Sequence, residues 1–172
     1  QPLPKGNKIQ IITDGGGFGI LTVDAAVTNG LVLSKMNEKT IVITGASSGI
    51  GQSLALAYAQ PEVQLLLTGR NSERLQQTVA DCQQQGAKVV SICVDVTNQN
   101  TLAHWLLQQD QLTPIDLIIA NAGCSSKQIE NQHPDLLTLE TAMTQIHFIG
   151  TLNTLHPIVP RMQQRGHGQI AL

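Results

Sequence analysis

Three glycines between residues 45 and 51 have the spacing that most clearly indicates chemistry. Residues 41–51 read Ile-Val-Ile-Thr-Gly-Ala-Ser-Ser-Gly-Ile-Gly, an apolar strand followed by a glycine-rich turn and the start of a helix. Gly45 permits a sharp turn, Gly49 lets backbone approach a phosphate, and Gly51 lets the helix pack closely on the sheet. The helix N-terminus directs its N–H groups and positive dipole end at an anion. The pattern predicts a site for the pyrophosphate of a dinucleotide.

The end of the second predicted strand carries a residue able to select the cofactor. About 24 residues after Gly45, the chain reads Thr68-Gly69-Arg70-Asn71. A carboxylate here would bond to the ribose 2′-hydroxyl of NAD, but Gly69 occupies the position and Arg70 follows it. A guanidinium can pair with a 2′-phosphate through its planar fork, so Arg70 favours NADP over NAD. The alternative is a solvated arginine at a strand end.

The sequence predicts alternating strands and helices, which must hold these residues in place. Strands that alternate with amphipathic helices indicate a parallel sheet with right-handed crossovers. The strands are nearly continuous apolar runs, as expected when both faces of a sheet are covered. We therefore expect a Rossmann-like, doubly wound α/β fold with three α/β/α layers. The expected strands are 41–44, 63–68, 88–94 and 115–120, and the expected helices are 51–59, one from 72, and one around 102–107.

Composition and charge exclude several other classes of protein. The 172 residues carry a formal net charge of −2, so no basic surface indicates a nucleic-acid partner. No apolar run approaches the roughly 20 residues that span a bilayer, so we expect no membrane partner. The three cysteines, Cys82, Cys93 and Cys124, have no metal-ligand spacing and no even count for a disulfide framework. We expect no metal site and a cytoplasmic location.

Residues 1–37 are expected to form a separate N-terminal extension, followed by a dinucleotide-binding domain over 38–172. The extension contains a predicted strand at 9–12, a glycine-rich run at 14–19 and a short helix to about Asn29. Residues 4–35 resemble the succinyl-CoA-ligase-like domain of ADP-forming acyl-CoA synthetases, in which a Gly-rich loop and helix N-terminus face a phosphorylated group. The alternative, which we favour, is a fused fragment whose strand and helix lie against a neighbouring fold.

From Met36 onward, four motifs in order resemble a short-chain dehydrogenase/reductase of the classical type. They are Thr44-Gly-Ala-Ser-Ser-Gly-Ile-Gly51, Asp95-Val-Thr97, Ala120-Asn-Ala-Gly123, and residues 147–150 with Pro160-Arg-Met162. The resemblance implies hydride transfer between a nicotinamide cofactor and a carbonyl or alcohol carbon. It also implies that Asp95 meets the adenine ring and that the Asn-Ala-Gly turn stabilises the sheet and borders the cofactor. The expected cofactor-binding residues are Gly45, Ser47, Ser48, Gly49, Ile50, Gly51, Arg70, Asp95, Asn121, Ala122 and Gly123.

The family's catalytic serine and Tyr-x-x-x-Lys pair follow its fifth strand, which we expect here at Gln169–Leu172. We therefore expect a truncated domain, incomplete at its C-terminal edge, and assign no catalytic residue. The one tyrosine, Tyr58, lies in the first predicted helix with Glu62 four residues on, and we expect it to pack against the sheet. His147 stands where the family has the asparagine of its proton relay. Histidine is bulkier than asparagine, so we expect His147 to be an ordinary half-buried, hydrogen-bonded residue.

A long helix is expected over about 135–164, with Pro157 and Pro160 bending or ending it. In the family this helix packs on the one after the fifth strand, and together they form the dimer seam. We expect its apolar stripe to be partly exposed here, with a risk of aggregation, and homo-oligomers only in a longer form. The stripe consists of Leu139, Met143, Ile146, Ile149, Leu152 and Leu155.

The leading hypothesis is the NADP-binding part of a short-chain dehydrogenase/reductase that is inactive by itself. Its partners would be the dinucleotide and, in a longer form, an unknown small carbonyl or alcohol substrate. A non-catalytic dinucleotide-binding module and an acyl-CoA ligase remnant are the alternatives.

Overall fold

The computed structural model describes residues 8–9, 32–33, 40–133 and 135–172. The chain divides into two units, residues 1–37 with Leu172 and residues 38–171. In the first unit, β1 (Lys8–Ile9) pairs in parallel with β2 (Val32–Leu33). The glycine-rich run and the helix expected in this segment lie outside the described residues.

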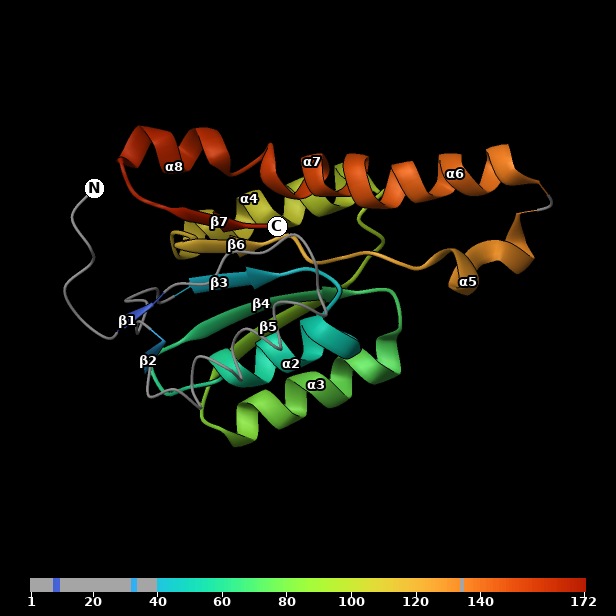
Figure 1. Ribbon diagram of the computed structural model, residues 1–172. Coiled ribbons are helices and arrows are strands. Elements are labelled where there is room, and N and C mark those ends of the chain that lie inside the picture. Colours follow the sequence, from blue (N-terminus) through green and yellow to red (C-terminus); the bar gives the residue numbers. More distant parts are fainter. Residues whose placement is uncertain (1–7, 10–31, 34–39, 134) are drawn as a thin grey trace. The chain divides into compact units, whose positions relative to one another are not determined.

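A five-stranded parallel sheet forms the centre of the second unit, with the strand order β5-β4-β3-β6-β7. The chain runs outward from β3 to β4 and β5, and then returns to β6 on the other side of β3 (Figure 1). The order therefore reverses at β3 and β6, and in such sheets ligands bind beyond the carboxyl ends of the strands at this reversal. The strands are β3 (Thr40–Ile43), β4 (Gln64–Gly69), β5 (Lys88–Cys93), β6 (Leu117–Ile119) and β7 (Gln169–Ala171).

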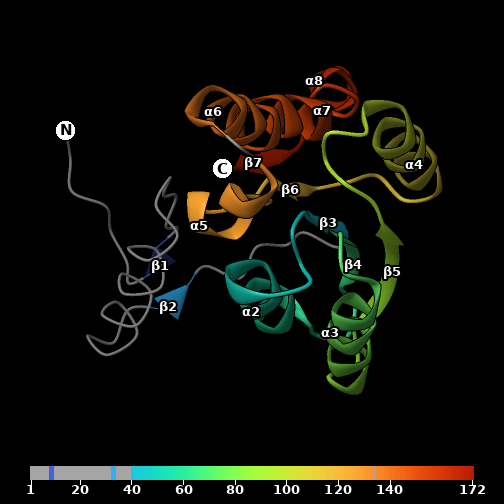
Figure 2. The ribbon, with the colours of Figure 1, turned by 90° about the vertical axis from the view of Figure 1, so that its right-hand side faces the viewer.

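Helices cover both faces of this sheet (Figures 1 and 2). On one face lie α2 (Gly49–Tyr58) and α3 (Ser72–Gln84). On the other lie α4 (Gln99–Leu112), α7 (Gly150–Leu155) and α8 (Val159–Arg165). Side chains of β3 that point to either face are consequently buried, and Ile41, Val42 and Ile43 are each at most 1% exposed. The three-layer Rossmann-like fold predicted from the sequence is confirmed.

Two elements differ from the expected pattern. Helix α4 spans 14 residues instead of the six expected at 102–107, because Asn98 caps it by accepting a 3.3 Å hydrogen bond from the Thr101 N–H. The residues near both ends of α4 are mostly polar, so the apolar pattern of the sequence indicated only the middle of the helix. Strand β5 lies at the edge of the sheet and is only partly buried, so continuous burial does not extend to it.

The long helix expected over 135–164 is divided into segments. Helix α6 (Leu136–Thr144) continues through a π-helical turn, η2 (Gln145–Ile149), into α7, which ends at Leu155. Helix α8 begins at Val159 with Pro160 in its first turn, so the predicted break near the two prolines is confirmed. The predicted apolar stripe is partly exposed, although Ile146 and Leu155 pack against the core.

Before α6, the chain forms a short helix and a 3₁₀ turn that the sequence analysis did not predict. They are α5 (Ser126–Ile129) and η1 (Glu130–Gln132). Figure 1 shows α5 and α6 beyond the carboxyl ends of the strands. These elements therefore lie at the side of the sheet where the predicted cofactor residues gather.

A cluster of ion pairs fastens α8 to α4. The Asp110 side chain is 1% exposed and pairs with Arg161 and with Arg165, whose Nη1 lies 3.0 Å from Oδ1. The Ile115 N–H also donates to Asp110 Oδ1 at 2.9 Å. Burial by itself raises the pKa of this carboxyl, but the Ile115 N–H and the two guanidiniums outweigh it and hold the pKa below its ordinary value. The cluster fixes the helix that leads into β7.

Within the described residues, no helix combines the length and apolarity needed to cross a bilayer.

Candidate cofactor-binding site

The turn between β3 and α2 is packed so tightly that two of its positions require glycine. Gly45 has a φ of +71°, and a Cβ there would lie 2.9 Å from the Ala122 Cα. A Cβ at Gly51 would lie 2.3 Å from the Gly45 carbonyl oxygen and 2.6 Å from Asn121 Nδ2. Helix α2 therefore starts directly against the ends of β3 and β6, as the glycine spacing predicts.

The N-terminus of α2 is open in a way that those of the other long helices are not. Its N-cap, Ser48, makes no side-chain capping hydrogen bond. By contrast, Asn71 caps α3 by accepting from the Arg74 N–H at 2.8 Å, and Asn98 caps α4. Gly49 has a φ of +58°, and apart from its chain neighbours and the backbone of its own helix no atom lies within 4 Å of where a Cβ would stand. The first turn of α2 thus has no side-chain cap, and an uncapped helix N-terminus suits an anion such as a phosphate.

Asn121 joins the two central strands where they end. Its Nδ2 donates to the Thr44 carbonyl at 3.0 Å, and the Ala122 N–H donates to Thr44 Oγ1, also at 3.0 Å. The side chain thereby holds the Asn-Ala-Gly turn beside the glycine turn. This is the sheet-stabilising position that the family resemblance implies for it.

Arg70 and Asp95 lie at the ends of neighbouring strands β4 and β5. Arg70 Nη1 is 3.6 Å from Asp95 Oδ2, and the two side chains are 54% and 37% exposed. Asp95 Oδ1 accepts from Thr97 N–H at 2.9 Å and from Thr97 Oγ1 at 2.7 Å. The carboxylate is therefore held by its own turn, with one oxygen facing the guanidinium.

These segments line one cavity of about 110 Å³ at the carboxyl side of the sheet. Of the eleven expected binding residues, seven line it: Gly45, Ser47, Ser48, Arg70, Asp95, Ala122 and Gly123. The other four, Gly49, Ile50, Gly51 and Asn121, belong to the same two turns without lining the cavity.

Six further residues, which the sequence analysis did not count as binding residues, complete the cavity wall. Gly69 had been noted at the end of the second predicted strand, and in the structure a Cβ there would lie 2.9 Å from the Ser47 Cβ. Val94 and Val96 flank Asp95 and could have been inferred from it. Gln128 and Ile146 come from α5 and η2, which carry no motif. The six are Thr68, Gly69, Val94, Val96, Gln128 and Ile146.

His147 lies on the π-helical turn and supports the loop after the Asn-Ala-Gly motif. Its Nε2 is 2.8 Å from the Cys124 carbonyl oxygen and 3.3 Å from the Cys124 nitrogen. The tautomer decides whether the ring donates to the carbonyl or accepts from the N–H. The ring also contacts Gly123, where a Cβ would come within 2.8 Å of Cε1. His147 is an exposed residue whose ring fixes backbone, which is a positioning role.

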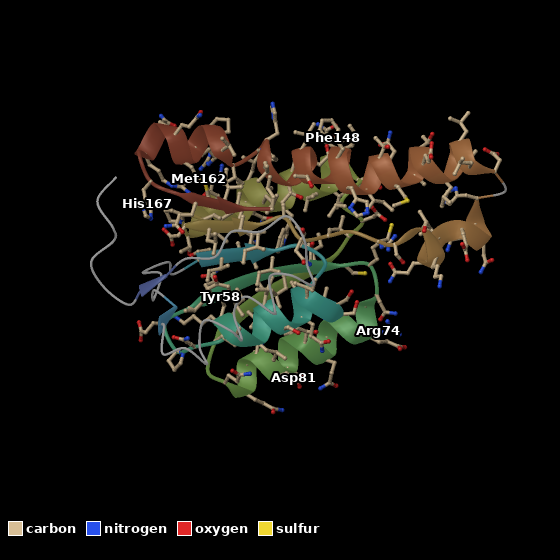
Figure 3. All side chains as sticks on the ribbon, viewed as in Figure 1. Tyr58, Arg74, Asp81, Phe148, Met162 and His167 are labelled. Atoms are coloured by element: carbon tan, nitrogen blue, oxygen red, sulfur yellow. The ribbon has the colours of Figure 1, made fainter. Side chains whose placement is uncertain are left out.

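Residues with other chemistry lie apart from this cavity. Tyr58 is half-buried in the last turn of α2 (Figure 3). Cys82 is buried in α3, and burial together with the nearby Asp81 raises the pKa of its thiol to about 11, which keeps it unreactive. Among the described residues, no three His, Cys, Asp or Glu side chains form a group able to hold a metal ion.

The chemistry of the cavity wall suits a phosphorylated ligand. The uncapped N-terminus of α2 can receive an anion, and the guanidinium of Arg70 adds a positive charge to the cavity wall. Ala122 and Gly123 contribute a part of the wall that has no bulky side chain.

The chain is similar in sequence to one protein family and to curated oxidoreductases. The family model described as short chain dehydrogenase matches residues 39–172. An uncharacterized oxidoreductase of Staphylococcus epidermidis is 33% identical over 140 residues, which make up 80% of this chain and 58% of that protein.

Two solved structures have similar folds. The NAD+-bound xylitol dehydrogenase is 23% identical with a TM-score of 0.68, covering 77% of this chain and 51% of that one. A short-chain type dehydrogenase/reductase from Mycobacterium marinum is 29% identical with a TM-score of 0.66, covering 77% and 53%. The chain therefore spans little more than half the length of these proteins.

Proposed function

The chain belongs to the short-chain dehydrogenase family, and from that membership we propose that it is the NADP-binding part of an oxidoreductase acting on a carbonyl or alcohol. One observation carries this proposal. The glycine turn, the Arg70–Asp95 pair and the Asn-Ala-Gly turn, which are far apart in the sequence, line a single cavity at the carboxyl ends of parallel strands.

Each part of the cavity has a distinct role in the proposal. The N–H groups at the start of α2 bind the pyrophosphate, and Ser47 and Ser48 border it. Asp95 and its neighbouring valines surround the adenine. Ala122 and Gly123 border the nicotinamide half, and Asn121 and His147 hold their turn in place. When bound, the nicotinamide supplies or accepts the hydride.

The preference for NADP rests on Arg70. Its side chain is 54% exposed at the cavity, and Gly69 leaves no carboxylate at the preceding position to receive a ribose 2′-hydroxyl. A planar guanidinium can bond to two oxygens of a 2′-phosphate at once. The cytoplasmic location, a homo-oligomeric longer form and the domain boundary at 37/38 belong to the same proposal.

These 172 residues are proposed to be inactive by themselves. Reduction of a carbonyl needs a positioned acid that delivers a proton to the oxygen. The one tyrosine, Tyr58, is in the last turn of α2, and Glu62 follows where a Tyr-x-x-x-Lys pair would have lysine. His147 is bonded to the Cys124 backbone.

Of the alternatives, a non-catalytic dinucleotide-binding module is supported by the same cavity. It is also supported by His147, whose ring contacts the Cys124 backbone instead of being free for proton transfer. The acyl-CoA ligase hypothesis depends on residues 4–35, nearly all of which lie outside the described residues.

Calorimetric titration of the purified chain with NADPH and with NADH tests the proposal. We expect NADPH to bind at least several-fold more tightly than NADH, and Arg70→Met to remove the difference. Saturable binding of neither nucleotide would refute the proposed site, and tighter binding of NADH would refute the NADP preference. Turnover of a panel of aldehydes and ketones by the same sample would contradict the proposed inactivity.

A further inference from the structure

The cation proposed to bind a 2′-phosphate already has a partner. Arg70 Nη1 lies 3.6 Å from Asp95 Oδ2, and both side chains line the same cavity. A nucleotide that carries a 2′-phosphate would therefore reach a guanidinium whose charge is partly neutralised. It would also bring its own negative charge close to a carboxylate.

The two members of the pair differ in how firmly they are held. Asp95 Oδ1 accepts two hydrogen bonds from Thr97, at 2.9 Å and 2.7 Å, so the carboxylate is fixed by its own turn. Arg70 is held at its backbone, where the Cys93 thiol donates to its carbonyl at 3.3 Å. Its side chain is 54% exposed, so the guanidinium can move and the carboxylate stays.

We propose that Asp95 is a specificity-determining residue that limits the preference for 2′-phosphorylated nucleotides through its ion pair with Arg70. The inference rests on the proposed function, because it concerns the same cavity. A 2′-phosphate has to draw the guanidinium away from Asp95 and is repelled by the carboxylate that stays behind. A nucleotide with a free 2′-hydroxyl has neither cost, so Asp95 acts selectively against the phosphate.

The expected effect is modest because the pair is exposed. Exposed ion pairs contribute little free energy, so we expect the loss of this pair to change the affinity for a 2′-phosphate by about two- to fivefold. Because solvent-exposed charges are screened by salt, the effect should decrease as ionic strength rises.

The informative variant is Asp95→Asn. An asparagine Oδ1 can still accept both hydrogen bonds from Thr97, so the turn is preserved while the charge is removed. Asp81→Asn is the matched control. It makes the same change of charge near the end of α3, in the region labelled in Figure 3, where Asp81 accepts from Gln77 Nε2 at 2.8 Å.

The test measures dissociation constants of adenosine 2′,5′-bisphosphate and 5′-AMP by calorimetry at low salt. We expect Asp95→Asn to tighten the bisphosphate by about two- to fivefold and not to tighten AMP. Asp81→Asn should leave the ratio of the two constants unchanged. An unchanged ratio in Asp95→Asn, or an equal rise in Asp81→Asn, would overturn the inference.

A double-mutant cycle then asks whether Asp95 acts through Arg70. In an Arg70→Met background, the gain from Asp95→Asn should shrink, because no guanidinium remains to be released. An undiminished gain would show that Asp95 acts on the phosphate alone and would overturn the mechanism. If the wild-type chain binds neither nucleotide, the proposed function fails and this inference with it. If both bind and the ratio does not respond, only this inference fails.

Discussion

At the scale of single residues, two glycines of the same turn are required for different physical reasons. At Gly51 the obstacle is space, because a Cβ would lie 2.3 Å from the Gly45 carbonyl oxygen. At Gly49 no other part of the described structure lies within 4 Å of a Cβ, and the obstacle is the left-handed φ of +58°. The first involves contacts between two elements of the fold, whereas the second is local to one residue.

Substitution with alanine should separate these two causes. Gly51→Ala should lower the free energy of unfolding by about 3 kcal/mol, since backbone on both sides resists the added methyl. Gly49→Ala should cost about 1 kcal/mol, the penalty of a side chain in a left-handed conformation. Urea unfolding followed by circular dichroism measures both. A Gly49→Ala variant as unstable as Gly51→Ala would contradict this assignment.

The ring of His147 provides the second prediction at this scale. Because it bonds to the Cys124 backbone and packs on Gly123, His147→Ala should free the turn that borders the cavity. We expect a loss of about 1 kcal/mol in stability, the usual contribution of one hydrogen bond, with weaker NADPH binding. His104→Ala, on an exposed position of α4, is the control. Equal effects of the two substitutions on NADPH affinity would show that the ring does not position the turn.

At the scale of elements, sequence reasoning succeeded where a local pattern dictates the outcome. The turn after β3 was predictable because its glycines are the residues that its φ angles and close contacts require. The same applies to the break before α8, where proline ends one helix and starts the next.

What could not be predicted depends on contacts between distant segments. The π-helical turn directly precedes the part of α7 that meets the segment after β5, where Gly150 lies against Val96 and Asn153 Nδ2 donates to the Val96 carbonyl at 3.0 Å. The residue pattern within the helix does not indicate this contact with a distant segment. For the same reason, Gln128 and Ile146 carried no signal as cavity residues, since α5 and η2 place them there.

The cluster around Asp110 carries the prediction that belongs to this scale, since it joins α4 to α8. Removing one partner of a buried ion pair leaves the others uncompensated. Asp110→Ala should therefore lower the free energy of unfolding by roughly 3–5 kcal/mol. Asp81→Ala, which removes a carboxylate that accepts a hydrogen bond from Gln77 within α3, should cost far less. Chemical denaturation at neutral pH compares the two, and similar losses would rule out a stabilising cluster.

The same cluster predicts how stability depends on pH. The pKa of Asp110 is lowered in the folded chain, so its stabilisation is present above the unfolded pKa of about 3.9 and is lost as pH falls through the folded value. The difference in unfolding free energy between the wild type and Asp110→Asn should therefore be largest near neutral pH and shrink in acid. A difference that stays constant down to about pH 2 would contradict the lowered pKa.

At the scale of the whole molecule, the feature with the widest consequence is apolar surface. Leu136 and Leu137 on α6, Phe148 on η2 and Leu152 on α7 are between 44% and 74% exposed. Phe148 lies on the outer side of this helical run (Figure 3). Soluble monomers rarely expose several large apolar side chains close together, because the area removed from water on association is favourable.

We therefore expect the chain to associate as its concentration rises, and a charge in place of Phe148 to oppose the association. Phe148→Glu removes 61%-exposed aromatic surface and places a carboxylate where apolar side chains would meet. Thr144→Glu is the matched control, since it adds the same charge one helical turn earlier at a position that is already polar and exposed. Sedimentation velocity over a range of concentrations should show Phe148→Glu sedimenting as a smaller species than both the wild type and Thr144→Glu. If both variants reduce association equally, added charge and not lost apolar contact is responsible. If neither does, the association surface lies elsewhere on the chain.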